Sequence, residues 1–189
     1  GIESNGQIMV ENEDQSLGLM FDDFGNFEHW GKSGPKGYFV TDPKGRKKHL
    51  TDVTADKANS FLVQRSKSEQ PFCLTLCFNA PHAQDDDERQ YIWPVRFDDY
   101  YVESTIPEPL NSAPNFFKRQ PDFLRGSLGR ERWRWRFDTP GKFQKMMKGM
   151  YRMVSGVDDA VGRLRDQLHK LDLAKNTIII YSSDNGMFF

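Results

Sequence analysis

The spacing of apolar residues changes several times along the chain, and each change marks a predicted element. The first forty or so residues are polar and glycine-rich without a clean period, which is typical of loops. From Thr51 or Thr54, either of which suits a helix N-cap, apolar residues recur about every 3.6 positions and predict a helix ending near Arg65. Residues 72–78 are apolar and uncharged, which predicts a short strand covered on both faces.

The same order returns after a long interruption. Residues 79–138 contain six prolines and many aromatic side chains, so we expect an irregular insertion with short helices inside it, a kind of connection that tends to be functional. Thr139–Pro140 predicts a helix start, and an apolar stripe continues to Leu171. Residues 177–181 predict a second buried strand. Three glycines predict a kink or break in the long helix: Gly149, Gly156 and Gly162.

Two strands separated by a helix define the predicted fold class. Such strands run parallel with a right-handed crossover in nearly all cases, so we predict an α/β fold with part of a mostly parallel sheet, flanking helices and the long insertion. The carboxyl ends of both strands then share the sheet edge where ligands bind in open α/β folds. Asn79–His82 and Ser183–Gly186 follow these strands directly and are expected to face one another.

Composition narrows the class of protein. The chain has 189 residues, 37% apolar and 13% aromatic, which fits one globular domain or a large part of one. With 26 basic and 27 acidic residues it has no nucleic-acid footprint. No apolar run approaches the roughly 18 residues that span a bilayer, and residues 1–10 lack the features of a signal peptide. Because the chain begins with Gly, we expect it to be processed or cut from a longer one.

The two cysteines are separated by three residues within the first predicted strand. Positions i and i+4 of a strand share a face but lie roughly 13 Å apart, whereas a disulfide requires Cα atoms within about 7 Å. Cys73 and Cys77 are therefore not expected to pair with each other. We interpret both as small buried apolar side chains.

The two loops at the predicted sheet edge contain the candidate site. Asp184 and Asn185 offer a carboxylate and an amide oxygen, hard donors that suit Ca²⁺ or Mg²⁺, and Gly186 permits a sharp turn beside them. Asp-Asn-Gly is also a common turn sequence without a ligand. His82 is a candidate hydrogen-bond donor to an anion or a proton-transfer group; the alternative is a loop histidine bound to a carbonyl.

Three other clusters have alternative interpretations. Asp85–Glu88 is interpreted as a solvated acidic loop, because consecutive carboxylates repel. Asp22–Asp23 is a weaker candidate metal pair, since no buried strand precedes it. Four arginines alternate with Trp133 and Trp135, and this patch would hold a sulfated sugar, with Arg134 and Trp135 as the candidate contacts, or would form a structural knot of Arg–carboxylate pairs. The four arginines are Arg130, Arg132, Arg134 and Arg136.

No Gly-x-Ser-x-Gly, Walker, His-Glu-x-x-His or dinucleotide-binding motif is present.

Three segments, in order and on the expected elements, resemble the type I sulfatases of the alkaline phosphatase superfamily. Pro71–His82 resembles their PFFLYLSFNAPH segment, Val157–Leu164 their VDDAVGRLLDAL helix, and Leu173–Gly186 their LADNTIVIFTSDNG segment. The last four residues resemble the start of a GxFLGEHG tail. The resemblance covers about residues 50–189, and it implies an alkaline-phosphatase-like sheet.

The resemblance implies a role for each candidate residue. Asp184 and Asn185 would bind the active-site Ca²⁺, with Mg²⁺ as the alternative, and His82 would contact the sulfate or the leaving oxygen. The family nucleophile is a formylglycine made from a cysteine in a C-x-P-S-R or C-x-A-S-R motif. The implied partner is a sulfated carbohydrate, and the implied location is periplasmic or extracellular. The sequence indicates no oligomeric state.

The chain departs from the family pattern at three points. Neither cysteine is followed by x-Pro-Ser-Arg or x-Ala-Ser-Arg, no upstream Asp–Asp metal pair is identifiable unless Asp22–Asp23 imitates it, and the lysine expected after Asp-Asn-Gly lies beyond Phe189. We therefore interpret residues 1–189 as a partial sulfatase catalytic domain that lacks the nucleophile segment and the C-terminal part, with formylglycine expected upstream and the isolated chain inactive. The alternatives are a phosphonate or phosphodiester hydrolase of the same superfamily and a non-catalytic module that binds sulfated glycans.

Overall fold

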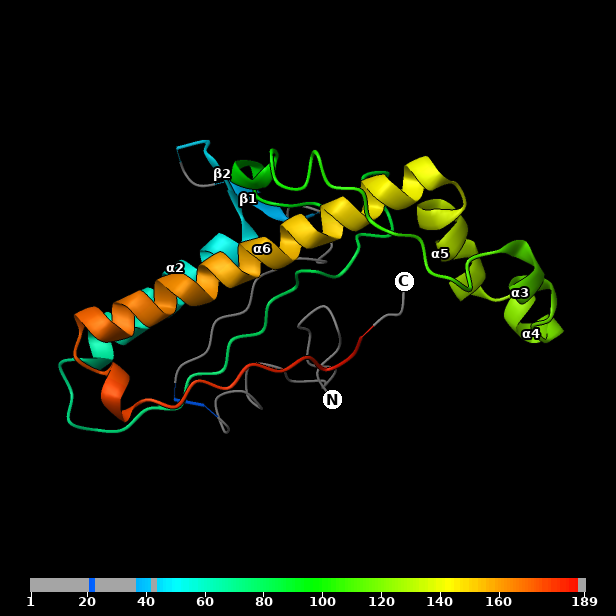
Figure 1. Ribbon diagram of the computed structural model, residues 1–189. Helices are drawn as coiled ribbons and strands as arrows, with labels where there is room; N and C mark the ends of the chain where they lie inside the picture. The colour runs from blue at the N-terminus through cyan, green and yellow to red at the C-terminus, as the bar shows by residue number, and fades with distance from the viewer. Residues whose placement is uncertain (1–20, 23–36, 42–43, 187–189) are drawn as a thin grey trace.

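The structure is a computed structural model, and it describes residues 21–22, 37–41 and 44–186. Two antiparallel strands, β1 (Phe39–Thr41) and β2 (Lys47–His49), form a small sheet in which Phe39 lies opposite His49. Two long helices, α2 (Leu50–Arg65) and α6 (Pro140–Lys170), pack along each other and form the body of the molecule (Figure 1). The remaining elements are short: η1 (Val95–Phe97), α3 (Pro114–Lys118), α4 (Asp122–Arg125), α5 (Leu128–Phe137) and η2 (Ala174–Asn176).

Helix α2 begins earlier than predicted: its N-cap lies two residues before Thr51 and five before Thr54. Its N-cap is His49, whose Nδ1 accepts a hydrogen bond from the backbone N–H of Thr51 at 3.2 Å. With Nδ1 as an acceptor, the ring proton of the neutral imidazole is on Nε2, which donates to the carbonyl of Ile92 at 3.0 Å. The prediction of Thr51 or Thr54 as N-cap was therefore wrong: both lie inside the helix, and the Thr54 hydroxyl donates to Leu50 O.

Helix α6 confirms the predicted start and is unbroken. The hydroxyl of Thr139 accepts from the backbone N–H of Lys142 at 3.3 Å, and Pro140 occupies the first turn. The break predicted at the glycines does not occur. A Cβ on Gly149 would lie 3.0 Å from side-chain atoms of Tyr91 and Trp93, so this glycine permits the close approach of another segment. Gly156 does the same for Pro94.

The hydrophobic core forms two clusters along α6. One lies under the first half of the helix and includes Tyr38, Tyr91, Ile92 and Met153, which are all at most 3% exposed. The other joins the two long helices through Ala58 and Leu62 of α2 and Leu164 and Leu168 of α6. These contacts use the apolar stripe that the sequence predicted for α6.

Residues 72–78 are extended but form no strand pairing with the described residues. Their burial alternates: Phe72, Leu74 and Leu76 pack on the α2–α6 cluster, whereas the opposite face is exposed. The prediction of a strand covered on both faces is thus half right. Cys73 and Cys77 lie on the open face, so the prediction that they are buried was wrong, and the prediction that they do not pair is confirmed.

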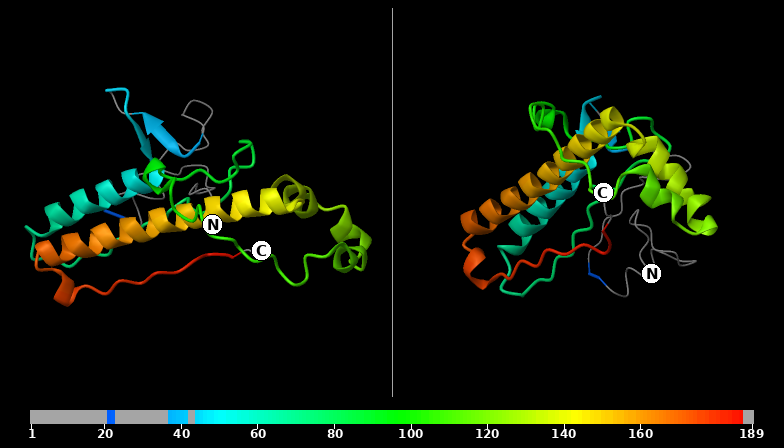
Figure 2. Two further views of the ribbon diagram at one scale, coloured as in Figure 1. Left: turned by 45° about the horizontal axis from the view of Figure 1, so that its top comes forward. Right: turned by 45° about the vertical axis from the view of Figure 1, so that its right-hand side comes forward.

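The second predicted strand is extended as well. Ile178, Ile179 and Ile180 are 89%, 51% and 85% exposed, and no residue of this segment pairs with a described strand. Figures 1 and 2 show that residues 72–82 and 177–186 run in the same direction from the η2 end of the helix pair. The sheet within the described residues is antiparallel and two-stranded, so the parallel sheet stays a prediction.

The long insertion is irregular with short helices inside it, as predicted. It contains η1, α3, α4 and α5, and it returns to the chain's main body at Thr139. None of the described helices is long and apolar enough to cross a membrane.

Candidate functional site

His82 lies on a turn whose backbone carbonyls accept hydrogen bonds from the buried Tyr38. The Tyr38 hydroxyl donates to the carbonyl oxygens of Asn79 at 2.9 Å and His82 at 2.6 Å, and the His82 N–H donates to Asn79 O at 2.9 Å. Tyr38 is 1% exposed, whereas the His82 side chain faces solvent. Among the described residues the His82 imidazole has no hydrogen-bond partner. The turn is therefore fixed through its main chain, and the imidazole is free to bind a ligand.

Burial keeps the Tyr38 hydroxyl a donor. It raises the pKa of Tyr38, and the nearby Tyr91 raises it further. The ring also stacks on His49, with ring centroids 5.2 Å apart and nearly parallel planes. Tyr38 is thus anchored by the same histidine that caps α2, which couples the start of that helix to the His82 turn.

A second set of contacts orders the loop that follows His82. The side-chain amide of Gln90 donates to the carbonyls of Gln84 at 3.2 Å and Asp87 at 2.7 Å, and its oxygen accepts from Arg136 Nε at 2.7 Å. Gln90 is 4% exposed, and so is Arg136. Because these groups are buried and satisfied, they stabilise the conformation of the loop that follows the His82 turn.

Asp184 and Asn185 lie on the exposed loop after residues 177–181. The hydroxyl of Ser183 donates to the carbonyl of Asn185 and closes a local turn. Asp184 lies at a bend of the chain, and the side chains of Asp184 and Asn185 remain accessible, so both the turn and the ligand-site interpretation stay predictions. Their oxygens fit a hard cation, but two donors are too few for the six to eight that Ca²⁺ takes. No group of three or more metal-ligating His, Cys, Asp or Glu side chains occurs within the described part of the chain.

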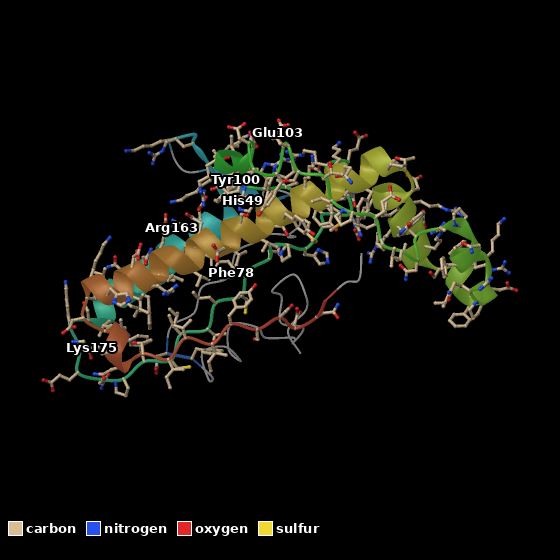
Figure 3. All side chains as sticks on the ribbon, in the orientation of Figure 1. His49, Phe78, Tyr100, Glu103, Arg163 and Lys175 are labelled. Atoms are coloured by element: carbon tan, nitrogen blue, oxygen red, sulfur yellow. The ribbon has the colours of Figure 1, made fainter. Side chains whose placement is uncertain are left out.

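The two candidate loops are not joined by a direct contact. No hydrogen bond or ion pair between described residues connects His82 with Asp184 or Asn185. A depression of about 200 Å³ lies between the C-terminal end of α6, η2 and the first residues of the 177–181 segment, and its lining includes His169, Ala174 and Ile179. Lys175 of η2 marks this end of the molecule in Figure 3, whereas the labelled Phe78 lies on the other extended segment, toward the His82 turn. The depression is therefore not the candidate site.

The acidic clusters divide between structural and solvated side chains. Asp85 binds Arg132 and Arg136, and Asp87 binds Arg89 at 2.7 Å, so these two carboxylates order their loop. The predicted solvated acidic loop is confirmed only for Asp86 and Glu88, which are exposed. The hydrogen bond from Arg89 lowers the pKa of Asp87 more than burial raises it. Asp22 is exposed, and its predicted partner Asp23 lies outside the described residues.

The arginine–tryptophan patch forms helix α5. In this helix the side chain of Arg136 is buried against Asp85, and Arg132 Nη2 lies 2.5 Å from the same carboxylate. For these two arginines the structural alternative is confirmed. Arg134 and Trp135, the candidate sugar contacts, face solvent instead, and Trp135 is 38% exposed.

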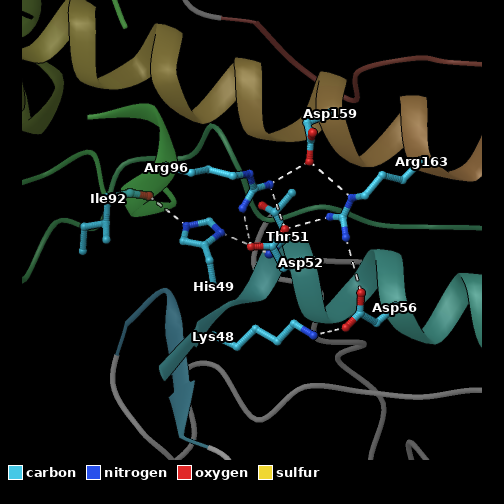
Figure 4. A network of polar contacts seen from close by, with 9 residues as sticks. All are labelled: Lys48, His49, Thr51, Asp52, Asp56, Ile92, Arg96, Asp159 and Arg163. Carbon is cyan, nitrogen blue, oxygen red and sulfur yellow. Dashed lines mark hydrogen bonds and ion pairs between the residues drawn. The ribbon is translucent and has the colours of Figure 1, made fainter. Parts of the chain in front are cut away.

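A charged network that sequence reasoning missed fixes the helices behind the site (Figure 4). Asp52 of α2 receives two hydrogen bonds from Arg96, at 2.8 and 2.9 Å, and one from Arg163 of α6 at 2.7 Å. Arg96 and Arg163 also share Asp159 of α6, at 2.7 and 3.2 Å. Asp159 and Arg163 of the Val157–Leu164 segment are thus structural, because they join both helices to η1.

Comparison with known proteins identifies the class of this chain. The family model described as Sulfatase matches residues 4–187. The chain therefore belongs to the sulfatase family, a class of sulfuric ester hydrolases with an alkaline-phosphatase-like α/β fold. No solved structure matches the chain significantly.

Three relatives indicate the range of the family. The chain is 26% identical to an N-acetylglucosamine-6-O-sulfatase of Bacteroides thetaiotaomicron over 86% of its own length, 26% identical to an ulvan-active sulfatase of Formosa agariphila over 74%, and 28% identical to a choline-sulfatase of Rhizobium meliloti over 71%. It spans 39%, 22% and 26% of the lengths of these relatives.

Proposed function

We propose that the protein hydrolyses sulfate esters of carbohydrates, and that this chain contributes two loops to the active site. The observation that carries the proposal is the position of His82 and of Asp184–Asn185. Each lies directly after an extended segment, and the two segments run in the same direction beside the α2–α6 pair (Figures 1 and 2). In an open α/β fold this arrangement brings both loops to one edge.

His82 would contact the sulfate group or the leaving oxygen. An imidazole that faces solvent on a turn with a fixed main chain can donate a hydrogen bond to an anionic oxygen, or give a proton to a departing alkoxide. The bonds from Tyr38 to Asn79 and His82 support this role, because they fix the imidazole's attachment point without occupying its nitrogens.

Asp184 and Asn185 would hold the family's divalent cation, Ca²⁺ or Mg²⁺. Their carboxylate and amide oxygens are of the type that such ions take, and further ligands must come from other residues of the protein. When bound, the ion neutralises charge on the sulfate oxygens. The residues of this chain supply the oxygen donors and, through the Ser183 contact, a turn that presents them.

The two extended segments would be strands of a mostly parallel sheet. Residues 72–78 have the alternating burial of a strand, with helices on one face and an open second face. Residues 177–181 are β-branched and apolar but exposed, which is costly for a free surface and expected for a segment that pairs with other strands. Additional strands of the protein would complete this sheet.

One observation favours a second candidate function. Neither Cys73 nor Cys77 stands in a formylglycine motif, so residues 1–189 contain no candidate for the family nucleophile. A protein without this nucleophile would bind sulfated glycans without cleaving them. The substrate is a separate question. Two relatives are named for N-acetylglucosamine and ulvan and a third for choline, so the sugar assignment rests on the first two.

The experiment compares sulfate release by the complete protein from N-acetylglucosamine-6-sulfate, choline sulfate and an aryl phosphonate. We expect release from the sulfated sugar, and a loss of about 10²–10⁴-fold in kcat for His82→Ala, the usual contribution of a positioned proton donor. The control is His169→Ala, an exposed histidine at the end of α6. Saturable sugar binding without any sulfate release would favour the binding module, and preference for the phosphonate would overturn the sulfatase assignment.

A further inference from the structure

The short helices of the insertion form a projecting arm, which we define as residues 113–138. It lies at the N-terminal end of α6, at the opposite end of the molecule from η2 (Figures 1 and 2). Helices α3 and α4 bury no residue, and α5 buries an arginine rather than an apolar side chain. Phe116, Phe123 and Trp135 are 42%, 75% and 38% exposed. These three rings are accessible to a partner on the surface of the arm.

The arm is strongly basic, and its four α5 arginines divide into two pairs. It contains seven Lys or Arg residues and three Asp or Glu residues. Arg132 and Arg136 lie one helical turn apart and both bind Asp85. Asp85 follows His82 by three residues, so this pair fastens the arm to the loop of the candidate active site.

The other pair, Arg130 and Arg134, has no carboxylate partner among the described residues. These positions also lie one turn apart, but two residues away from the first pair, which places them on the opposite side of α5. The Cζ of Arg130 is 3.6 Å from the ring centroid of Phe117 and 3.7 Å from that of Trp133. The two rings thus cover much of the guanidinium group, and hydrogen bonds to a ligand would come from its terminal N–H groups.

No ion pair between described residues neutralises the charges of Arg130 and Arg134. Burial lowers the pKa of Arg130, and the charge of Arg134 lowers it further, with Asp138 opposing both in part. Asp138 itself binds Lys142 at 2.8 Å. The Nε of Arg130 is buried without a hydrogen-bond acceptor. Like charges one turn apart destabilise a helix, and Arg130 lies in the first turn of α5, where an anion is also favoured by the helix dipole. A bound anion would reduce the repulsion between the two guanidinium groups and complement the N-terminal end of the helix.

We propose that Arg130 and Arg134 form a second binding site for a sulfate group of a polysaccharide chain whose neighbouring sugars lie on the exposed rings of the arm. The identity of the ligand as a sulfated glycan rests on the proposed function. A guanidinium presents paired N–H donors that match two oxygens of a sulfate. Trp135 offers an aromatic face for a sugar ring on the same helix. The site would hold a long substrate while a different sulfate of it occupies the loop of His82.

A lipid surface fits the same charges less well. Membrane-binding segments combine a broad basic face with a separate apolar face, whereas the guanidinium of Arg130 is largely covered by two rings and offers its terminal N–H groups to a single oxyanion. Helix α5 has only ten residues, and its opposite side is occupied by the contacts to Asp85. Recognition of a discrete sulfate is therefore favoured over adsorption to anionic lipid.

The test measures binding of the complete protein to a carrageenan oligosaccharide and to its chemically desulfated form, by calorimetry at two salt concentrations. All proteins contain His82→Ala so that the ligand is not consumed. We expect Arg134→Gln to weaken binding of the sulfated form about tenfold, the effect of one charge-assisted hydrogen bond, and to reduce the salt dependence. Arg134 faces solvent, so this variant should fold even if Arg130→Gln does not. The matched control is Arg125→Gln, which removes one charge from the same arm but from a residue already paired with Asp122.

Each other outcome would overturn the second site. Unchanged affinity in Arg134→Gln would show that the pair is not used, and equal losses in Arg134→Gln and Arg125→Gln would show unspecific attraction to net charge. Equal binding of the desulfated form would exclude sulfate recognition. Stronger Arg134-dependent binding to phosphatidylglycerol vesicles than to the oligosaccharide would identify lipid as the partner. Failure of the proposed hydrolysis appears separately, as absence of sulfate release by the protein with His82 intact.

Discussion

Asp52 shows how a single buried carboxylate organises this structure. Its side chain is 13% exposed and receives hydrogen bonds from two arginines that come from η1 and α6. Burial raises the pKa of Asp52, but the hydrogen bond from Arg96 and the charges of Arg96 and Arg163 outweigh it, so that the pKa lies below its usual value. The ionised form is therefore the form that stabilises the fold.

The sign of this shift predicts an acid-sensitive fold. A carboxyl whose pKa is lower in the folded state contributes stability above its unfolded pKa, about 3.9, and loses it as the pH falls through the folded value. We expect Asp52→Asn to cost about 2 kcal/mol at pH 7, because it removes the carboxylate that accepts three charge-assisted hydrogen bonds while Asp159 still pairs with both arginines, and to cost less below pH ~4. Urea unfolding at both pH values measures this. Asp158→Asn is the control, because Asp158 is exposed and outside the network; an equal loss in both variants would contradict the prediction.

Tyr38 is the residue on which the position of His82 depends most directly. We expect Tyr38→Phe to reduce the free energy of unfolding by about 1–2 kcal/mol, because it leaves the carbonyls of Asn79 and His82 without their buried donor. If His82 acts as proposed, sulfate release by the complete protein should fall as well, and more than the unfolded fraction explains. Tyr100→Phe is the control, since Tyr100 is 48% exposed. Full activity in Tyr38→Phe would show that the turn does not need this anchor.

At the residue scale, sequence reasoning found groups that follow strands and missed groups that bind at a distance. His82, Asp184 and Asn185 were selected because each follows an apolar run, a property of the local sequence. Tyr38 and His49 act on carbonyls more than forty positions away, and no local pattern indicates such a partner. The motif Val157–Leu164 was visible, but its role in an ion-pair network was not.

The elements differ in how far local sequence determines them. The start of α6 was predictable because Thr139 and Pro140 act within one turn. The start of α2 was not, because histidine caps a helix only when its ring is held, and here the carbonyl of Ile92 holds it. The three glycines of α6 led to the prediction of a kink or break in this helix. Two of them, Gly149 and Gly156, are instead required because residues 91–94 pack closely against them.

This difference among the glycines gives a prediction about α6. A Cβ on Gly149 would lie 3.0 Å from Tyr91 and Trp93, whereas one on Gly162 would have no atom within 4 Å. We expect Gly149→Ala to destabilise the protein by about 1–3 kcal/mol through overpacking. Gly162→Ala should stabilise it by about 0.5–1 kcal/mol through helix propensity. Thermal unfolding of both variants measures this, and equal effects of the two substitutions would show that segment 91–94 does not approach α6 so closely.

At the scale of the whole molecule, the described residues form one covered side and one open side. The α2–α6 pair covers Phe72, Leu74 and Leu76, while Cys73 and Cys77 face away from the helices. The sequence predicted cover on both faces, because a run of apolar residues without polar alternation is typical of a central strand. The chain spans 39% or less of the lengths of the three relatives, and the proposed sheet would supply the second cover.

The cysteines can report whether this second cover exists. In the complete protein we expect Cys73 and Cys77 to react slowly with a thiol reagent under native conditions, because an added layer on the open face would exclude the reagent and hold the thiols in an apolar environment. In the isolated 189-residue chain both should react at the rate of exposed thiols. Peptide mapping after timed labelling assigns each rate to its cysteine, and labelling in denaturant gives the upper limit. Fast labelling of both in the complete protein would mean that the open face stays open, and residues 72–78 would then be no interior strand of a sheet.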